Sequence, residues 1–156
     1  MRVLQIIPDN DNMFLVKSLI GKSSDKRIKK QTLDFYRNGY ETFVADGNNV
    51  VMLVAYDSSN LIVGISACAI RDDGSRVSHP ITIVDREFRN KNLGATLLKR
   101  KLDIVSKRYS EKLYRCAVAD SNEAAMQLCL SSGMCAVEHG TRVRKDKTID
   151  YTVFEL

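Results

Sequence analysis

The sequence lacks the features that mark membrane, secreted and disulfide-stabilised proteins. Charged residues interrupt its apolar runs well short of the roughly 20 residues that span a bilayer, and its N-terminal residues do not resemble a signal peptide. It contains no CxxC pair, low-complexity tract, linker or internal repeat. These absences predict a soluble, cytoplasmic protein without a structural metal or a disulfide framework.

What is present is typical of one ordinary globular domain. A chain of 156 residues is long enough to bury a core without metals or disulfides, so we expect a single domain over residues 1–156. The formal charge of +5 favours phosphates, nucleic acid or an acidic protein face as ligands, without selecting among them. Four cysteines stand in apolar surroundings and are expected to be buried free thiols: Cys68, Cys116, Cys129 and Cys135.

The spacing of apolar and turn-forming residues predicts an α/β chain with the order β-α-α-β-β-β-α-β-α-β-β. The expected elements are a strand over 3–7, helices over 13–20 and 24–37, strands over 50–56, 61–70 and 77–84, a helix over 93–109, a strand over 113–118, a helix over 123–132, and a hairpin over 135–143 and 148–154.

The stretch from Ile81 to Leu98 combines a strand, a basic turn and the start of a helix. The first turn of a helix exposes unpaired backbone N–H groups at the positive end of the helix dipole, which favours binding of an anion such as a phosphate. Three cations lie in the turn, and two small residues at the helix start let a ligand approach the main chain: Arg86, Arg89 and Lys91, then Gly94 and Ala95. The alternative is an ordinary basic turn of an α/β protein.

This junction resembles the acyl-CoA signature of the GNAT superfamily of N-acetyltransferases, Gln/Arg-x-x-Gly-x-Gly/Ala. The matching residues are Val84-x-x-x-x-Arg89-x-x-Asn92-x-Gly94-Ala95. Asn92 replaces the first glycine of the signature, and Asn90 stands at a second position that is often glycine. Asn is the non-glycine residue that best tolerates a left-handed backbone. We therefore expect Asn92 to have a positive φ or to lie close to the phosphates.

A later stretch resembles the second GNAT signature, Asn-x-x-Ala-x-x-Leu-Tyr-x-x-x-Gly-Phe. The matching residues are Asn122-x-x-Ala125-x-x-Leu128-Cys129-x-x-x-Gly133-Met134. The order of elements is the GNAT order over the whole chain, which implies an α+β fold with a central mixed, mostly antiparallel, splayed sheet of about seven strands and four helices. Pro80 cannot donate to a strand ladder and is expected at the bulge of that fold, although an ordinary sheet edge would also explain it.

The resemblance implies that acetyl-CoA lies where the sheet splays and that an amine attacks its thioester directly. By position, the backbone of Thr82, Ile83 and Val84 would pair with the pantetheine arm, and the Val84 N–H would polarise the thioester carbonyl. Asn122 would cap its helix, which alone explains an Asn there, or would cap it and also touch the cofactor. The residues expected around the pyrophosphate are Arg89, Asn90, Lys91, Asn92, Leu93, Gly94 and Ala95.

The residues for proton transfer match the family less closely. Where the family commonly has a Tyr that protonates the departing thiolate, the sequence has Cys129, which is either a weak acid or a core residue. Where some members have a Glu base, the sequence has Ser78, which is not a strong base at neutral pH. His79 has a suitable intrinsic pKa, but it serves as a base only if the bulge reorients it. Otherwise it is a structural or exposed histidine.

The sequence thus predicts an N-acetyltransferase acting on a primary amine of a small molecule or a protein. The alternative is a catalytically weak GNAT-fold protein that binds CoA or uses a basic surface against nucleic acid or an acidic protein. In either case the protein is expected to be a monomer or a homodimer. One basic face lies on the helix over 24–37 and is otherwise a solvated surface: Lys26, Arg27, Lys29 and Lys30. Basic residues in the helix over 93–109 suit its dipole without any functional role: Lys99, Arg100, Lys101, Lys107 and Arg108.

Overall fold

The computed structural model describes residues 1–7, 10–23, 25–26, 29–30, 50–70, 77–109 and 114–156. The helix predicted over 24–37 falls largely outside these residues. The described elements are β1 (Arg2–Ile6), α1 (Asn10–Gly21), β2 (Val50–Tyr56), β3 (Ile62–Ile70), β4 (Val77–Val84), the 3₁₀ helix η2 (Arg86–Phe88), α3 (Leu93–Arg108), β5 (Arg115–Ala119), α4 (Glu123–Ser131), β6 (Cys135–Arg144) and β7 (Lys147–Glu155). Their bounds agree with the predicted ones to within a few residues; η2 was not predicted.

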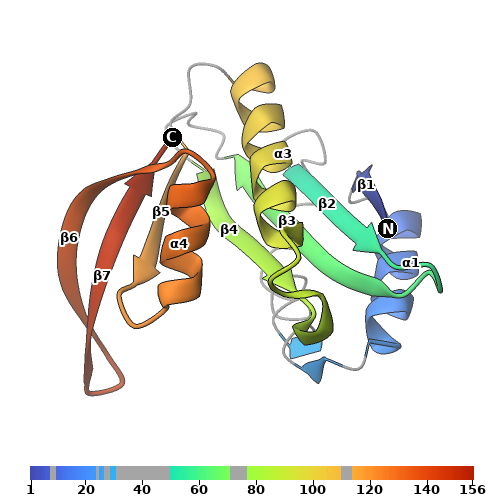
Figure 1. The fold of residues 1–156 in the computed structure, drawn as a ribbon, viewed down its shortest axis with the longest axis horizontal. Coiled ribbons are helices and arrows are strands. Elements are labelled where there is room, and N and C mark those ends of the chain that lie inside the picture. The colour runs from blue at the N-terminus through green and yellow to red at the C-terminus, as the bar shows by residue number, and fades with distance from the viewer. Residues whose placement is uncertain (8–9, 24, 27–28, 31–49, 71–76, 110–113) are drawn as a thin grey trace.

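The strands form two antiparallel sheets, in the orders β1-β2-β3-β4 and β5-β7-β6. Figure 1 shows the two sheets side by side, with β4 and β5 at their boundary, α3 across the first sheet and α4 beside the second. Among the described strands, none pairs with the outer edge of β4. The predicted α+β class with about seven strands is therefore confirmed, but the described strands form two antiparallel sheets instead of one mixed sheet, and three of the four predicted helices lie among the described residues. No described helix is long and apolar enough to cross a bilayer.

Strand β2 is buried on both faces, which explains its unbroken apolar sequence VVMLVAY. Because side chains alternate along a strand, its even-numbered residues share a cluster with α1: Val50, Met52 and Val54 with Val16 and Ile20. Its odd-numbered residues pack toward α3: Val51 with Leu98 and Leu102, and Leu53 and Ala55 with Leu93 and Leu97. Helices α1 and α3 thus cover the two faces of the first sheet, and the outer edge of β4 is not covered by a described strand.

A β-bulge interrupts the pairing of β3 with β4. Ala67 pairs with Ile81 and Ala69 pairs with Ser78, so β4 advances by one residue more than β3 over this interval. The extra residue lies in the segment that contains Pro80, as the missing N–H of proline predicts. The expected bulge at Pro80 is confirmed. It lies directly before the half of β4 that forms the site described below.

Two expectations about side chains are wrong. The four cysteines are not all buried, because Cys135 is exposed and Cys116 is only half-buried. Cys135 begins β6, an edge strand of the second sheet whose side chains face solvent, and this explains its exposure. The helix dipole does not account for Lys101, whose side chain is only 1% exposed. It follows Leu97 by one helical turn and therefore lies on the buried face of α3.

Candidate functional site

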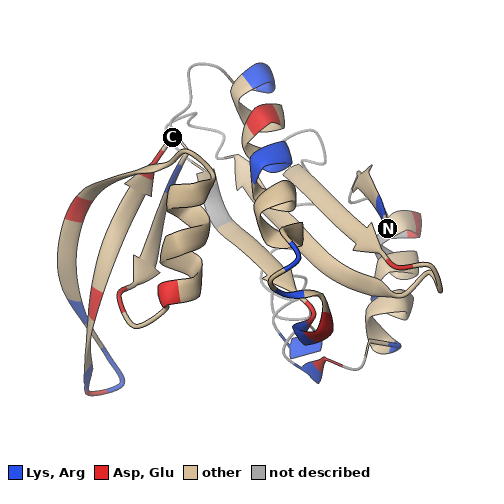
Figure 2. Ribbon diagram, in the orientation of Figure 1, with Lys and Arg blue, Asp and Glu red and all other residues tan. Residues whose placement is uncertain are grey.

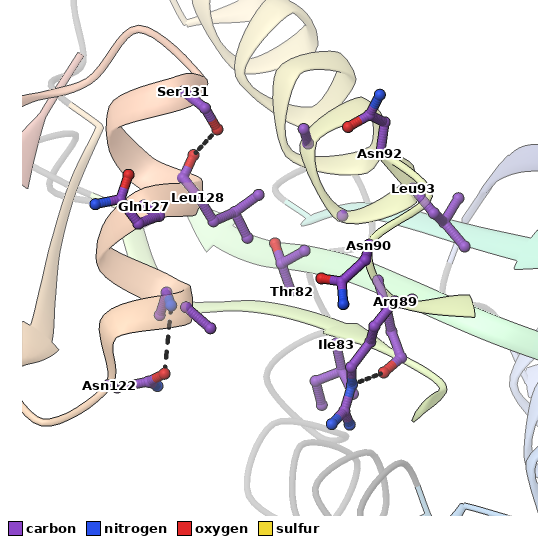
Figure 3. Close-up of a pocket in the computed structure, with 15 residues that line it drawn as sticks. Thr82, Ile83, Arg89, Asn90, Asn92, Leu93, Asn122, Gln127, Leu128 and Ser131 are labelled. Atoms are coloured by element: carbon purple, nitrogen blue, oxygen red, sulfur yellow. Dashed lines mark hydrogen bonds between the residues drawn. The ribbon is translucent and has the colours of Figure 1, made fainter. Parts of the chain in front are cut away.

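A cavity of about 470 Å³ lies between the second half of β4, the start of α3, and α4 (Figure 3). Every residue that the sequence assigns to cofactor binding lies in its lining except Lys91. The lining consists of Thr82, Ile83, Val84, Arg89, Asn90, Asn92, Leu93, Gly94, Ala95, Asn122, Ala124, Ala125, Gln127, Leu128 and Ser131. The fold thus brings together residues of both signatures, which are separated by a helix and a strand in the chain.

The outer edge of β4 presents alternate backbone groups to this side of the sheet. The Asp85 N–H donates to the Val63 carbonyl at 2.8 Å. In an antiparallel ladder, a bond between these two residues makes the adjacent pair, Val84 and Gly64, a non-hydrogen-bonded pair. Val84 therefore directs its N–H and C=O away from β3, and Thr82, two residues earlier, does the same. Ile83 directs its backbone groups toward β3. Of the three residues expected to pair with pantetheine, only Thr82 and Val84 have main-chain groups directed to the open edge.

The loop between β4 and α3 contains two asparagines with left-handed backbone conformations. Asn90 has φ 60° and Asn92 has φ 59°, so the predicted positive φ of Asn92 is confirmed. Asn92 is the N-cap of α3, but its side chain makes no capping hydrogen bond. The N–H groups of the first turn of α3 therefore stay available at the positive end of the helix dipole, and Leu93, Gly94 and Ala95 of this turn line the cavity.

Two carboxylates stabilise the conformation of this loop. Asp85 is buried, and its side chain accepts the hydrogen bond that caps η2. Asp25 Oδ2 accepts a hydrogen bond from the Arg86 N–H at 3.1 Å and lies 3.5 Å from the Arg89 guanidinium. Arg89 Nε also donates to the Val84 carbonyl at 3.0 Å, as Figure 3 shows. The Arg89 side chain is thus fixed in the cavity wall. The role of Asp25 was not predicted, because the ion pair joins segments far apart in sequence.

Charges of both signs follow one another along this loop (Figure 2). Asp85 and Glu87 alternate with the basic residues, and the Lys91 ammonium lies 5.3 Å from the centre of the Phe88 ring, outside the cavity lining. An anion at the start of α3 would therefore meet the backbone N–H groups first, with the Arg89 guanidinium as a cationic side chain beside it.

Helix α4 forms the opposite wall of the cavity. The Asn122 side chain accepts a hydrogen bond from the Ala125 N–H at 3.3 Å, so the predicted cap is confirmed. In Figure 3, Leu128 and Thr82 point toward one another from α4 and β4. Gly94 lies between these walls, because a Cβ added there would be 3.5 Å from Val84 Cγ2 and 3.6 Å from Leu128 Cδ1. The lining residues Ala124, Gln127 and Ser131 were not predicted, although their spacing of three to four residues marks one face of a helix.

Cys129 lies on the other side of α4. Its side chain is 5% exposed, it packs in the cluster with Met134 and Phe154, and its Sγ lies 3.9 Å from Cys116 Sγ. Hydrogen bonding from the Cys116 thiol to Cys129 Sγ lowers the pKa of Cys129 and raises that of Cys116. The cavity is lined by the neighbouring Leu128 and not by Cys129. The other candidate for proton transfer, His79, belongs to β4, but its side chain and that of Ser78 lie outside the described part of the structure.

A model of the acetyltransferase (GNAT) family matches residues 21–134. The chain belongs to the GNAT acetyltransferase family. A chimera of the spermidine N-acetyltransferase SpeG from Vibrio cholerae with hSSAT has the same fold, with 16% identity, a TM-score of 0.71, and coverage of 100% of this chain and 95% of that chain. So has yncA from Salmonella typhimurium, solved with its cofactor acetyl-CoA, with 16% identity, a TM-score of 0.65, and coverage of 99% and 92%. No curated protein matches the sequence.

The cavity of this GNAT acetyltransferase has the backbone features that the resemblance to the first signature implies. The signature needs a loop in a left-handed conformation and an uncapped helix start, and the chain supplies both with Asn90, Asn92 and the first turn of α3. It also needs a strand edge for the pantetheine amides, which the outer edge of β4 supplies. At Cys129, where the resemblance to the second signature implies a tyrosine, the chain has a thiol that faces the core.

Proposed function

We propose that this enzyme transfers an acetyl group from acetyl-CoA to a primary amine by direct attack in a ternary complex. The observation that carries the proposal is the cavity itself, in which an open strand edge and an uncapped helix N-terminus face the same space. The strand edge suits the amides of pantetheine, and the helix start suits the pyrophosphate. The reactive thioester would then lie beside β4, between the Val84 N–H and the side chains of Thr82 and Leu128.

The chemistry requires one new bond and the loss of another. The lone pair of a neutral amine attacks the thioester carbonyl carbon, negative charge gathers on the carbonyl oxygen, and the C–S bond then breaks to release the CoA thiolate. The proton lost by the nitrogen ends on the thiolate, so that the products are an amide and free CoA. The Val84 N–H, directed away from β3, would donate a hydrogen bond to the carbonyl oxygen. Positioning of the two substrates in one complex would supply the rest of the rate acceleration.

The acceptor is a primary amine whose identity we propose only as a class. One structural neighbour derives from a spermidine N-acetyltransferase, but 16% identity extends the likeness to the fold alone. A formal charge of +5 also gives this chain no overall attraction for a polyamine cation. Small amines and protein amines therefore belong in the same test as polyamines.

The test is release of CoA thiol from acetyl-CoA in the presence of single members of an amine panel. The panel contains polyamines, aromatic and aliphatic amines, and peptides with a free N-terminus or a lysine. The proposal predicts saturable, amine-dependent thiol release with at least one class, and an acetylated product of matching mass. If acetyl-CoA binds and no amine raises thiol release above hydrolysis, the chain is a binding protein.

The second candidate function is binding of CoA or acetyl-CoA without acetyl transfer. It is favoured by the burial of Cys129, because no described side chain at that position of α4 reaches the cavity as an acid. Calorimetry separates this candidate from a repurposed fold, since a CoA-binding protein still binds CoA and acetyl-CoA. A repurposed fold would bind neither of them.

A further inference from the structure

A lysine ammonium lies in the core directly behind the cavity wall. Lys101 belongs to α3, and its side chain is 1% exposed. Its Nζ donates hydrogen bonds to the Ala67 carbonyl at 3.3 Å, the Ile81 carbonyl at 3.1 Å and the Thr82 hydroxyl at 3.4 Å. All three N–H groups of the ammonium therefore have acceptors, and one acceptor, Thr82, lines the cavity.

The charge of Lys101 has no acidic partner among the described residues. The ion pairs of the described chain involve other cations, and the groups that face Lys101 are Cys68 of β3, Cys116 of β5, Cys129 of α4, and the Tyr114 ring, whose centre is 5.4 Å away. Burial lowers the pKa of Lys101 to about 8, so its ammonium form predominates at neutral pH. An uncompensated buried cation is costly, and an apolar side chain of the same length would fill the space without that cost.

The hydrogen-bond directions at Thr82 show where this charge can act. Thr82 Oγ1 lies 2.7 Å from the Ser66 hydroxyl, and either oxygen can donate in that pair. The alternative acceptor for Ser66 is the Ile81 carbonyl at 3.4 Å, a longer contact to an oxygen that already accepts from Lys101. When Ser66 donates to Thr82, two donors occupy the Thr82 oxygen. Because Thr82 also lines the cavity, its own proton is then available to an acceptor bound there.

We propose that Lys101 is a positioning residue for acetyl transfer: it holds the Thr82 hydroxyl as a hydrogen-bond donor to the reacting thioester and strengthens that donor with its positive charge. The inference rests on the proposed function. As the amine attacks, electrons move to the carbonyl oxygen and then, with the C–S bond, to sulfur. The Thr82 hydroxyl stabilises this charge by a hydrogen bond and keeps its proton. Lys101 thus compensates, through the strand, for the phenol that is absent at Cys129.

The first arm of the test measures steady-state rates of three variants. Lys101→Met removes the charge at nearly constant length, Thr82→Val removes the hydroxyl, and Lys99→Met removes an exposed charge from the same helix as a control. We expect Lys101→Met and Thr82→Val to lower kcat by on the order of a hundredfold, the scale of one oxyanion donor, with KM for acetyl-CoA within about threefold. Lys99→Met should match wild type. A folded Lys101→Met with wild-type kcat overturns the proposal.

The pH profile distinguishes positioning from a purely structural role. With an acceptor whose amine is already neutral below neutral pH, wild-type kcat should fall as the pH rises through about 8, because deprotonation of Lys101 removes the charge. Lys101→Met should lack this basic limb and should be uniformly slow. If Lys101 only supports the fold, the variant loses thermal stability but keeps the shape of the wild-type profile.

The second arm needs no acceptor. The pKa of the CoA thiol in the complex is read from thiolate absorbance, with the desulfo-CoA complex subtracted to remove the protein thiols. The proposal predicts a bound thiol pKa below that of free CoA in wild type, and loss of this shift in Lys101→Met. An unshifted pKa in wild type overturns the proposal even if the variant does not fold. A shift that depends on Lys101, found together with no transfer to any amine, would show that Lys101 acts on the bound sulfur through Thr82 and would reject the proposed function alone.

Discussion

The start of α3 and the middle of α4 both depart from the residue types of the GNAT signatures, with opposite structural results. At α3, Asn92 replaces a glycine but has φ 59°, the backbone conformation that a glycine would supply. At α4, Cys129 replaces a tyrosine, and its sulfur lies against Cys116 in the core while Leu128 faces the cavity. The start of α3 keeps the left-handed backbone of the signature, whereas α4 lacks the phenol oxygen that would protonate the departing thiolate.

The difference lies in what each site needs from its residues. An anion site at a helix N-terminus is made of main-chain N–H groups, so any residue that tolerates the left-handed region preserves it. A general acid is one atom with one pKa at the end of one side chain, so a shorter side chain removes it. The enzyme should therefore bind the cofactor as its family does and handle the leaving group differently.

The largest effect should follow from filling the space beside the α3 N-terminus. Gly94→Leu places a branched side chain between Val84 and Leu128, and we expect acetyl-CoA affinity to fall by on the order of a hundredfold or more because the cavity is blocked. Gly94→Ala is the matched control, since its Cβ meets both neighbours at ordinary contact distance. Calorimetry measures the acetyl-CoA affinity of both variants. Equal affinities for wild type and Gly94→Leu would place the cofactor elsewhere.

A smaller effect tests the backbone of the loop. Asn92→Val puts a β-branched residue at φ 59°, which costs about 1–3 kcal/mol of strain, and we expect acetyl-CoA affinity to fall by roughly tenfold. Asn92→Gly should bind as well as wild type or better, because glycine adopts this conformation freely. Titration of both variants makes the comparison. If valine and glycine bind acetyl-CoA alike, the left-handed conformation does not matter for the cofactor.

The cap of α4 separates a structural from a binding role. Asn122→Ala removes the bond to the Ala125 N–H, and we expect the free energy of unfolding to fall by about 1 kcal/mol with acetyl-CoA affinity within about threefold. Asn122→Asp keeps the cap and adds a negative charge. Denaturant unfolding and calorimetry on both variants give the two quantities. A large loss of affinity in a stable Asn122→Asp would show that the phosphates lie next to this residue.

The smallest effect is expected at Cys129. Because its side chain faces Cys116 and the core, Cys129→Ala should leave kcat within about threefold of wild type while lowering stability by about 1 kcal/mol. Steady-state kinetics measures kcat, and thermal unfolding measures the stability of the variant. A hundredfold loss of kcat in a folded variant, on the order of a lost general acid, would show that the thiol takes part in the reaction after all.

The sequence predicts the elements well where local signals are strong. Strand β4 has its predicted bounds, the bulge at Pro80 follows from a missing N–H, and the αL backbone of Asn92 follows from residue type. Long-range pairings were not predictable in the same way, since the contact of Asp25 with Arg89 depends on how distant segments meet.

The burial of Lys101 was not predicted from the sequence, although the helical period of α3 indicates it. A basic residue in the second half of a helix suits the dipole, and that explanation was sufficient on the sequence alone. The helical period indicates burial instead, because Leu97, Leu98 and Val105 are buried and Lys101 lies on the same face of α3. Helical period, taken before charge, would have identified the buried ammonium. It would not have shown that Thr82 accepts from it.

Titration of the wild-type protein with acetyl-CoA and with acetyl-pantetheine, which lacks the nucleotide and its phosphates, tests the central claim most directly. If the uncapped start of α3 holds the pyrophosphate, acetyl-CoA should bind on the order of a hundredfold more tightly, and salt should weaken its binding by screening the exposed charges. Equal affinity for the two ligands, or no binding of either at millimolar concentration, would contradict the account.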